Sequence, residues 1–203
     1  MIGEQWLDGL KYRWLERRKG EQFGRYFPPA PAGEYISLDL ETSSLDTKTA
    51  EILEIAAVPV RGNKVYPGEA LILKVKPTGQ LHPDSVPVHQ IREKDLEQGV
   101  APLEAIIELL TFVGRRPIIG YNIRFDQLIL SRYCQQYLGF PLPNRVLELS
   151  QRYYRRKLNT QPDKVGDLRF DTLCRDLDIP ILERHTARGD AITTALAWIK
   201  LEH

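Results

Sequence analysis

The first clear change of hydrophobic period comes at Tyr35. From there Ile36, Leu38 and Leu40 alternate with polar positions, and this period of two predicts a strand with one apolar face. Apolar runs over 51–60 and 64–76 predict two more strands, and the turn-forming letters RGN between them predict a hairpin. The pattern therefore opens with antiparallel strands.

A helical period replaces the strand period after residue 101. Pro102 suits the first turn of this helix, because a backbone N–H at that position would have no intrahelical acceptor and proline has none to leave unpaired. The apolar face of the helix would contain Leu103, Ile106, Ile107, Leu110 and Val113.

Strand and helix patterns then alternate. The letters RPIIGYN, residues 116–122, predict a short buried strand, and 188–201 predict a final helix. Between them, 125–138 predict a helix whose apolar face would contain Phe125, Leu128, Ile129 and Tyr133. Leading strands followed by alternating helices and strands predict an α/β fold with a mixed sheet flanked by helices.

Residues 1–27 predict one amphipathic helix, whose apolar face would contain Trp6, Leu10, Trp14 and Leu15. The prolines of FPPAPAGE end it and predict a boundary near Gly33, between an N-terminal segment, 1–33, and a main domain, 34–203. The segment is either a strap that packs its two tryptophans on the main domain or an arm that binds a partner or nucleic acid.

Composition narrows the class of protein. With 203 residues, of which 42% are hydrophobic and 27% charged, the chain has the size and balance of one globular domain with a short appendage. The net charge of +1 means that a nucleic-acid partner would have to meet a local basic patch. Two distant cysteines, Cys134 and Cys174, argue against a cysteine zinc site. No secretion signal or long apolar run occurs, so we expect a cytoplasmic protein without a membrane span.

Two carboxylates interrupt the first strand in the stretch YISLDLETSSLD. Asp39 and Glu41 are two residues apart, so their side chains share one face, with α-carbons roughly 6.5 Å apart. Two desolvated carboxylates this close repel each other, and a bound cation relieves that repulsion. The alternative is a solvated strand end.

Three more polar residues are candidates for the same site. Asp126 and Asp190 open predicted helices, where a carboxylate also suits the helix dipole, and His185 lies in a stretch without apolar periodicity. Carboxylate oxygens with one histidine suit Mg²⁺ or Mn²⁺ better than structural zinc.

The ordered stretches DLETSSLD, YNIRFDQLIL and HTARGDA closely resemble the three motifs of the DnaQ-like, or DEDDh, family of 3′–5′ exonucleases. The resemblance covers about residues 34–199. It implies a ribonuclease H-like α/β fold with a five-stranded mixed sheet. Among relatives, the chain is similar to the epsilon proofreading subunit of DNA polymerase III, which makes a polymerase subunit a candidate partner.

The resemblance also implies roles for individual residues. Asp39, Glu41, Asp126 and Asp190 would hold two Mg²⁺ or Mn²⁺ ions. His185 would be the general base, since a neutral histidine accepts a proton at neutral pH. The reaction would release nucleoside 5′-monophosphates from the 3′ end of nucleic acid, with single-stranded DNA favoured. Trimming of RNA 3′ ends and a role as an inactive nucleic-acid-binding or polymerase-binding module remain alternatives. A nucleotide-cofactor enzyme is disfavoured, because the sequence has no GxGxxG or Walker A stretch.

The sequence departs from the family pattern around the substrate. Tyr121 stands where the second motif usually has histidine, although Asn122 is kept. By resemblance, Thr42 and Asn122 would contact the 3′-terminal nucleotide, and His89 would lie at the rim. The stretch RYYRRK, residues 152–157, is either a basic patch for nucleic acid or the solvated face of a helix.

Overall fold

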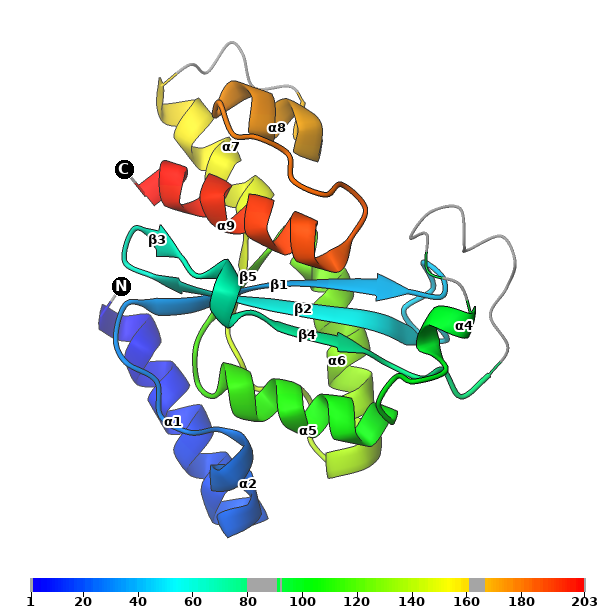
Figure 1. Ribbon diagram of the computed structural model, residues 1–203. Coiled ribbons are helices and arrows are strands. Elements are labelled where there is room, and N and C mark those ends of the chain that lie inside the picture. Colours follow the sequence, from blue (N-terminus) through cyan, green and yellow to red (C-terminus); the bar gives the residue numbers. More distant parts are fainter. Residues whose placement is uncertain (1, 80–90, 92, 161–166, 203) are drawn as a thin grey trace.

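The computed structural model describes residues 2–79, 91, 93–160 and 167–202, and it centres on a mixed sheet (Figure 1). Along the sheet the strands follow the order β3-β2-β1-β5-β6, and β4 also pairs with β2. Their bounds are β1 Glu34–Thr42, β2 Ile52–Arg61, β3 Lys64–Val65, β4 Leu71–Lys74, β5 Ile118–Gly120 and β6 Val146–Glu148. The α/β fold with a mixed sheet is confirmed.

The hairpin after β2 differs from its prediction. Residues 64–76 form two strands, β3 and β4, separated by a 3-10 turn, η1, at Pro67–Glu69. Proline has no N–H to donate to a ladder, so the strand is interrupted there. Both pieces pair with the outer side of β2, β3 near Val60 and β4 near Ala56. The described strands therefore fill five positions, as the family resemblance implied.

The second half of the sheet is parallel to β1. Strand β5 pairs with β1, and β6 pairs with β5, both in parallel. Strand β6 was not predicted, because a three-residue strand is too short to show a period.

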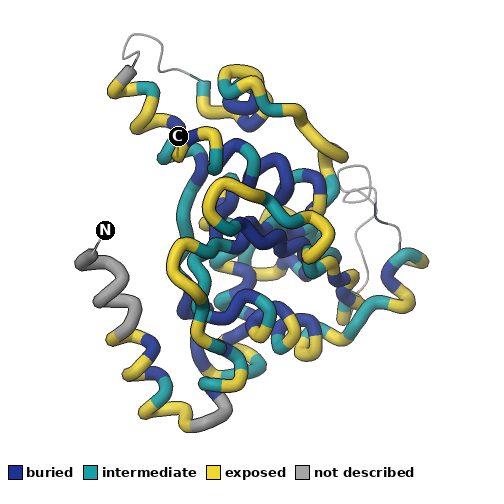
Figure 2. The backbone as a smooth tube through the Cα atoms, turned by 60° about the vertical axis from the view of Figure 1, so that its left-hand side comes forward, coloured by how far each residue is buried: buried dark blue, intermediate teal, exposed yellow. Residues whose placement is uncertain are grey.

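Helices cover both faces of the sheet (Figures 1 and 2). Ile36 and Leu38 of β1 belong to the same buried cluster as the inner faces of α5, Pro102–Val113, and α6, Ile123–Leu138. On the opposite face, Ser37 is fully buried and donates its hydroxyl to the carbonyl of Ala191, at 2.7 Å, in α9, Ala187–Glu202. Because α9 lies on the Asp39 face of β1, that face is not a solvated surface. Three further helices of the main domain are α4 Glu93–Leu96, α7 Leu149–Thr160 and α8 Phe170–Asp176.

Two predicted helix faces are partly wrong. Leu103 and Leu128 are each 41% exposed, whereas Leu109 and Leu130 are buried. In α5 the sheet contacts a stripe around Ile106 and Leu110, and Leu103 lines a surface groove instead. A periodicity read without the sheet shows that a helix has an apolar side but leaves its rotation uncertain by one position.

The N-terminal segment forms two helices rather than the single helix predicted over 1–27. Helix α1, Ile2–Lys19, ends at Gly20, whose φ of 70° interrupts the helix, and α2 spans Glu21–Tyr26. Tyr12, Leu15, Phe23 and Phe27 enter the main core cluster beside Phe140.

Of the two alternatives for this segment, the strap would pack Trp14 on the main domain, and the structure does not bear that contact out. Its side chain is 55% exposed, with the Arg18 guanidinium 4.8 Å from its ring centre. Trp6 lies outside the residues whose side chains are described. The boundary near Gly33 stays a prediction. Among the described residues no helix has the length and apolar character needed to cross a bilayer.

Candidate active site

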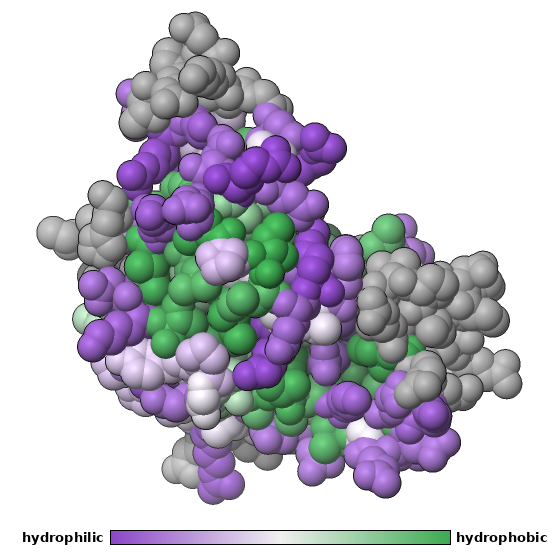
Figure 3. Space-filling view, turned by 45° about the horizontal axis from the view of Figure 1, so that its top comes forward, coloured by the Kyte–Doolittle hydropathy of each residue, from purple (hydrophilic) through white to green (hydrophobic). Residues whose placement is uncertain are grey.

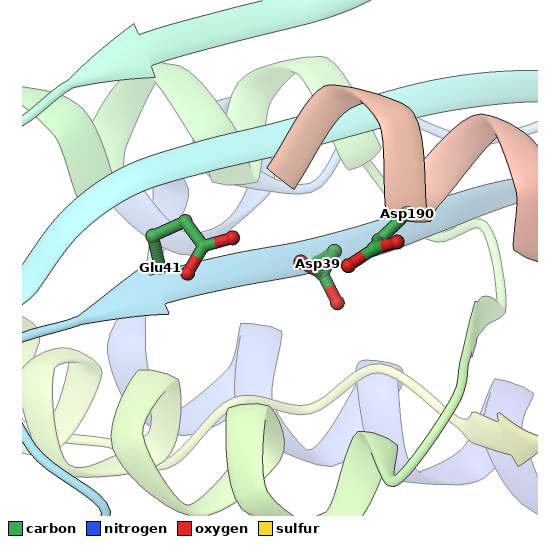
Figure 4. Close-up of side chains that lie close together, drawn as sticks. All are labelled: Asp39, Glu41 and Asp190. Atoms are coloured by element: carbon green, nitrogen blue, oxygen red, sulfur yellow. The ribbon is translucent and has the colours of Figure 1, made fainter. Parts of the chain in front are cut away.

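Three carboxylates meet where β1 ends and α9 begins (Figure 4). Asp39 and Glu41 project from β1 and Asp190 from the first turn of α9, and one oxygen of each lies within 4.8 Å of the others. Asp190 lies 149 positions after Glu41 in the sequence, and it meets the two β1 carboxylates because α9 crosses the Asp39 face of β1. The structure therefore brings three of the four predicted metal ligands together.

Asp126 lies in the same pocket but is already engaged. It is 5% exposed, and its Oδ1 accepts a hydrogen bond from the backbone N–H of Leu40 at 3.1 Å. This bond fixes the start of α6 against β1. Among the described residues, the cluster whose carboxylate oxygens lie within 4.8 Å of one another contains Asp39, Glu41 and Asp190 but not Asp126.

Burial and the like charges of their neighbours make the carboxylates of this pocket costly to ionise. Burial, followed by the charges of Asp126, Glu41 and Asp190, raises the pKa of Asp39 well above its ordinary value. Burial, with Asp190 and Glu54 nearby, raises the pKa of Glu41 to about 8. Burial likewise raises the pKa of Asp126 to about 8, opposed by its backbone hydrogen bonds. Carboxylates in such a position need a cation in order to ionise at neutral pH.

One cation already touches the cluster. Arg184 donates from its Nη1 to Oδ2 of Asp190 at 2.8 Å, and its guanidinium lies 4.9 Å from the ring centre of Phe170. The other oxygen of Asp190, Oδ1, is buried and has no hydrogen-bond partner in the described structure. A buried, unpartnered carboxylate oxygen in a cluster with two other acids fits a cation-binding site.

The donor set therefore fits the divalent ions that the family implies. It consists of hard carboxylate oxygens without a cysteine, which favours Mg²⁺ or Mn²⁺ over zinc.

His185 lines the same pocket from the turn before α9. Its φ of 64° lies in the left-handed region, which costs energy for a residue with a Cβ. The turn is held by Thr186, whose hydroxyl accepts a hydrogen bond from the N–H of Gly189 as an N-cap. A Cβ at Gly189 would lie 2.2 Å from the Leu182 carbonyl oxygen, so only glycine lets the turn fold back this closely.

The predicted substrate contacts have three different outcomes. Asn122 lines the pocket, and its left-handed backbone, with φ of 54°, is a conformation that asparagine tolerates. Thr42 donates its hydroxyl to the carbonyl of Ser44 at 2.9 Å and does not line the pocket. His89 lies outside the described residues.

Apolar and aromatic side chains form the rest of the pocket, whose volume is about 520 Å³. Tyr121, which replaces the usual histidine, lies 4.9 Å from Phe170, ring centre to ring centre, and donates its hydroxyl to the Leu168 carbonyl. Leu45, which is 88% exposed, and Phe125 also line the pocket.

Sequence reasoning missed two polar residues of the site. Arg184 stands next to His185, but a loop has no period that would reveal where a side chain points. Glu148, at the end of β6, accepts hydrogen bonds from the N–H groups of Asn122, at 3.0 Å, and Ile123, at 2.9 Å. It thereby satisfies the first N–H groups of α6. The only sequence feature that pointed to Glu148 was its position as an acid directly after a short apolar run.

The comparisons with known proteins agree with the motifs. The family model described as "Exonuclease" matches residues 36–197. A PolC-type DNA polymerase III of Caldanaerobacter subterraneus subsp. tengcongensis is 27% identical over 83% of this chain, which spans only 12% of that protein. The DNA polymerase III subunit epsilon of Aquifex aeolicus is 29% identical over 57% of this chain and 56% of its own length.

Solved structures show the same fold. Exonuclease I of E. coli in complex with a dT13 oligonucleotide superposes with a TM-score of 0.70 at 19% identity, covering 83% of this chain and 40% of that one. The family match spans most of the chain and includes Asp39, Glu41, Asp126, His185 and Asp190. The chain therefore belongs to the exonuclease family, the DnaQ-like family that its three motifs resemble.

Proposed function

We propose that this chain is a metal-dependent 3′–5′ exonuclease that releases nucleoside 5′-monophosphates from the 3′ end of single-stranded DNA. The observation that carries this is the convergence of Asp39, Glu41 and Asp190 in a pocket that also contains His185 and an apolar rim. Carboxylates, a base and a surface for stacking are the parts that hydrolysis at a nucleotide end requires.

Asp39, Glu41 and Asp190 would hold one divalent ion, and Asp126, in the same pocket, would share in holding a second. Such ions lower the pKa of an attacking water and stabilise charge on the attacking and leaving oxygens. Arg184 binds Oδ2 of Asp190, so the other oxygen, Oδ1, stays available to an ion.

The residues around the carboxylates would position the reacting groups. His185, exposed at the mouth of the pocket, would take the proton of the attacking water. Leu45 and Phe125 offer apolar surface on which the terminal base can stack. Asn122, held by the Glu148 bond to its backbone, would contact the terminal nucleotide.

DNA is favoured because the relatives named above are DNA polymerase III proteins, and structural neighbours include complexes with dT13 and dA16 oligonucleotides. The same relatives make a DNA polymerase a candidate partner. The chain spans a small part of the PolC-type proteins, so that association is a proposal about the whole assembly.

The test is digestion of matched single-stranded DNA and RNA oligonucleotides, labelled at the 5′ end, with Mg²⁺, Mn²⁺ or EDTA. We expect a ladder that shortens from the 3′ end, faster on DNA, and that disappears with EDTA. Faster shortening of RNA would show that RNA is the preferred substrate. Oligonucleotides that stay intact with both metals would show that the chain is not an exonuclease.

Replacement of His185 by asparagine separates the base from the metal site. Asparagine tolerates the left-handed backbone at this position but cannot accept a proton in the reaction. We expect kcat to fall about 10²–10⁴-fold, while the metal-induced rise in Tm stays that of the wild type. An unchanged kcat would remove His185 from the mechanism.

A further inference from the structure

A second pocket lies along the β6 edge of the sheet. It has a volume of about 600 Å³ and is lined by β6, the outer side of α7 and the end of α9. Four arginines contribute to its lining, namely Arg145, Arg152, Arg155 and Arg156. We call it the arginine groove. In the face shown in Figure 3, hydrophilic side chains gather below the grey segment at the top, where α7 and α8 lie.

Helix α7 arranges most of these groups in one row. Arg152, Arg155, Arg156 and Asn159 have the spacing i, i+3, i+4 and i+7, so they share one face of the helix, and all four line the groove. The row is about 10 Å long, at 1.5 Å per residue. It therefore presents several cations in succession to a linear polyanion.

Contacts with α9 hold two of the arginines in place. Arg152 pairs with Glu202, with its guanidinium 4.8 Å from the ring centre of Trp198, and Arg156 donates to the carbonyl of Lys200 at 3.0 Å. Arg155 between them is exposed. Guanidinium groups that are already ordered lose less entropy when they bind an anion.

The arginine groove adjoins the catalytic pocket. Glu148 lines the groove, and it accepts the backbone N–H of Asn122, which lines the catalytic pocket. A strand whose 3′ end lies beside Asp39 would then pass Asn122 and Glu148 to reach α7.

We propose that the arginine groove binds the phosphates of the nucleic-acid strand upstream of the 3′ end. This inference rests on the proposed function and adds the path of the substrate. Recognition is by phosphate, because the one aromatic ring in the described lining of the groove, that of Trp198, is only 5% exposed and cannot stack on a base. Tyr153 is buried with its hydroxyl on Asp176, and Tyr154, which is 40% exposed, does not line the groove. The groove is the local basic site that a chain of net charge +1 needs.

Arg155→Gln and the double variant Arg155→Gln/Arg156→Gln test the groove. The single variant leaves the Arg156 bond to α9 intact, so it retains the helix packing. The control is Arg25→Gln/Lys64→Gln, which removes two exposed cations from α2 and β3. Fluorescence anisotropy of an oligonucleotide of about 12 nucleotides, in EDTA and at several KCl concentrations, gives the slope of log K against log[salt].

For a single strand, each lost phosphate contact lowers the magnitude of this slope by about 0.7. We expect a decrease of about 0.7 for the single variant and about 1.4 for the double variant, and none for the control. With Mg²⁺, kcat/KM should fall for the 12-nucleotide substrate but not for one of about 4 nucleotides, which reaches only the catalytic pocket. Slopes equal to that of the control would overturn the groove while hydrolysis of the short substrate still supports the exonuclease. Failure of the wild type to cut either substrate would overturn the exonuclease, and the slopes would still report whether α7 binds phosphates.

Discussion

Replacing Asp39 by asparagine is expected to abolish exonuclease activity while the fold is retained. The amide has nearly the shape of the carboxylate but carries no charge, and its NH₂ group cannot bind a cation. The pKa of Asp39 is raised by burial and by the charges of three other acids, Asp126, Glu41 and Asp190, so its carboxylate is the one that a bound cation would relieve from all of them. Replacing a residue that only hydrogen-bonds to a metal ligand already lowers metal affinity or activity by about 10–100-fold. Replacing a ligand itself should cost more, so we expect kcat/KM to fall more than about 100-fold.

The measurement is kcat/KM on the labelled DNA with Mg²⁺, together with calorimetric titration of Mn²⁺ into the protein. The matched control is Asp178→Asn, which makes the same chemical change at an exposed position where φ of 54° suits asparagine. Asp39→Asn should lose both activity and Mn²⁺ binding, and the control should keep both. If Asp39→Asn retained activity within 10-fold, the carboxylate cluster would not be the catalytic centre.

The second large effect is on stability and depends on pH. Without a divalent ion, the protein is expected to lose stability as pH rises from about 4.5 to about 8. The pKa of Glu41 is raised from 4.5 to about 8, and the pKa values of Asp39 and Asp126 are also raised. Between these limits the folded chain holds more protons than the unfolded chain, so the free energy of unfolding decreases with pH. The contribution is fully present below pH 4.5 and is lost as pH passes 8.

We expect the loss to be on the order of 2 kcal/mol, or a decrease in Tm of about 4–8 °C for a chain of this size. Thermal unfolding in EDTA at pH 5 and pH 8 measures it. Added Mn²⁺ should raise Tm more at pH 8 than at pH 5, because the ion binds the ionised carboxylates.

Asp39→Asn connects the two results. Because asparagine removes one buried charge, the variant should be more stable than the wild type at pH 8 in EDTA and should gain little from Mn²⁺. A wild-type Tm in EDTA that does not fall between pH 5 and pH 8 would show that the cluster is not a site of charge repulsion.

The long elements of this fold could be predicted from the sequence. The alternation of Ile36, Leu38 and Leu40 identified β1, and α5 and α6 follow clear periods. Pro102 marks the start of α5. The final helix was also predicted, at 188–201, although α9 is buried on most sides and has no single apolar face. Shorter elements could not be predicted. Strand β6 has three residues and α8 has seven, so neither is long enough to show a period.

The sequence determined which residues are available for chemistry, because the three motifs with Asp39, Glu41, Asp126, His185 and Asp190 lie in one order along the chain. Only the tertiary structure decided how close they are. Packing of α9 on β1, fixed in part by the Ser37 bond to Ala191, brings Asp190 to Asp39, and this contact spans more than 150 residues of chain.

The tertiary structure also decided which neighbours modify the site. Arg184 on Asp190, Glu148 on the start of α6 and the row of arginines on α7 depend on the directions of side chains in loops and on the rotation of helices. A hydrophobic period specifies which side of a helix is buried, but polar contacts across elements are set by packing of the whole core. For that reason the sequence predicted the carboxylates of this site, and only the structure revealed the cations beside them.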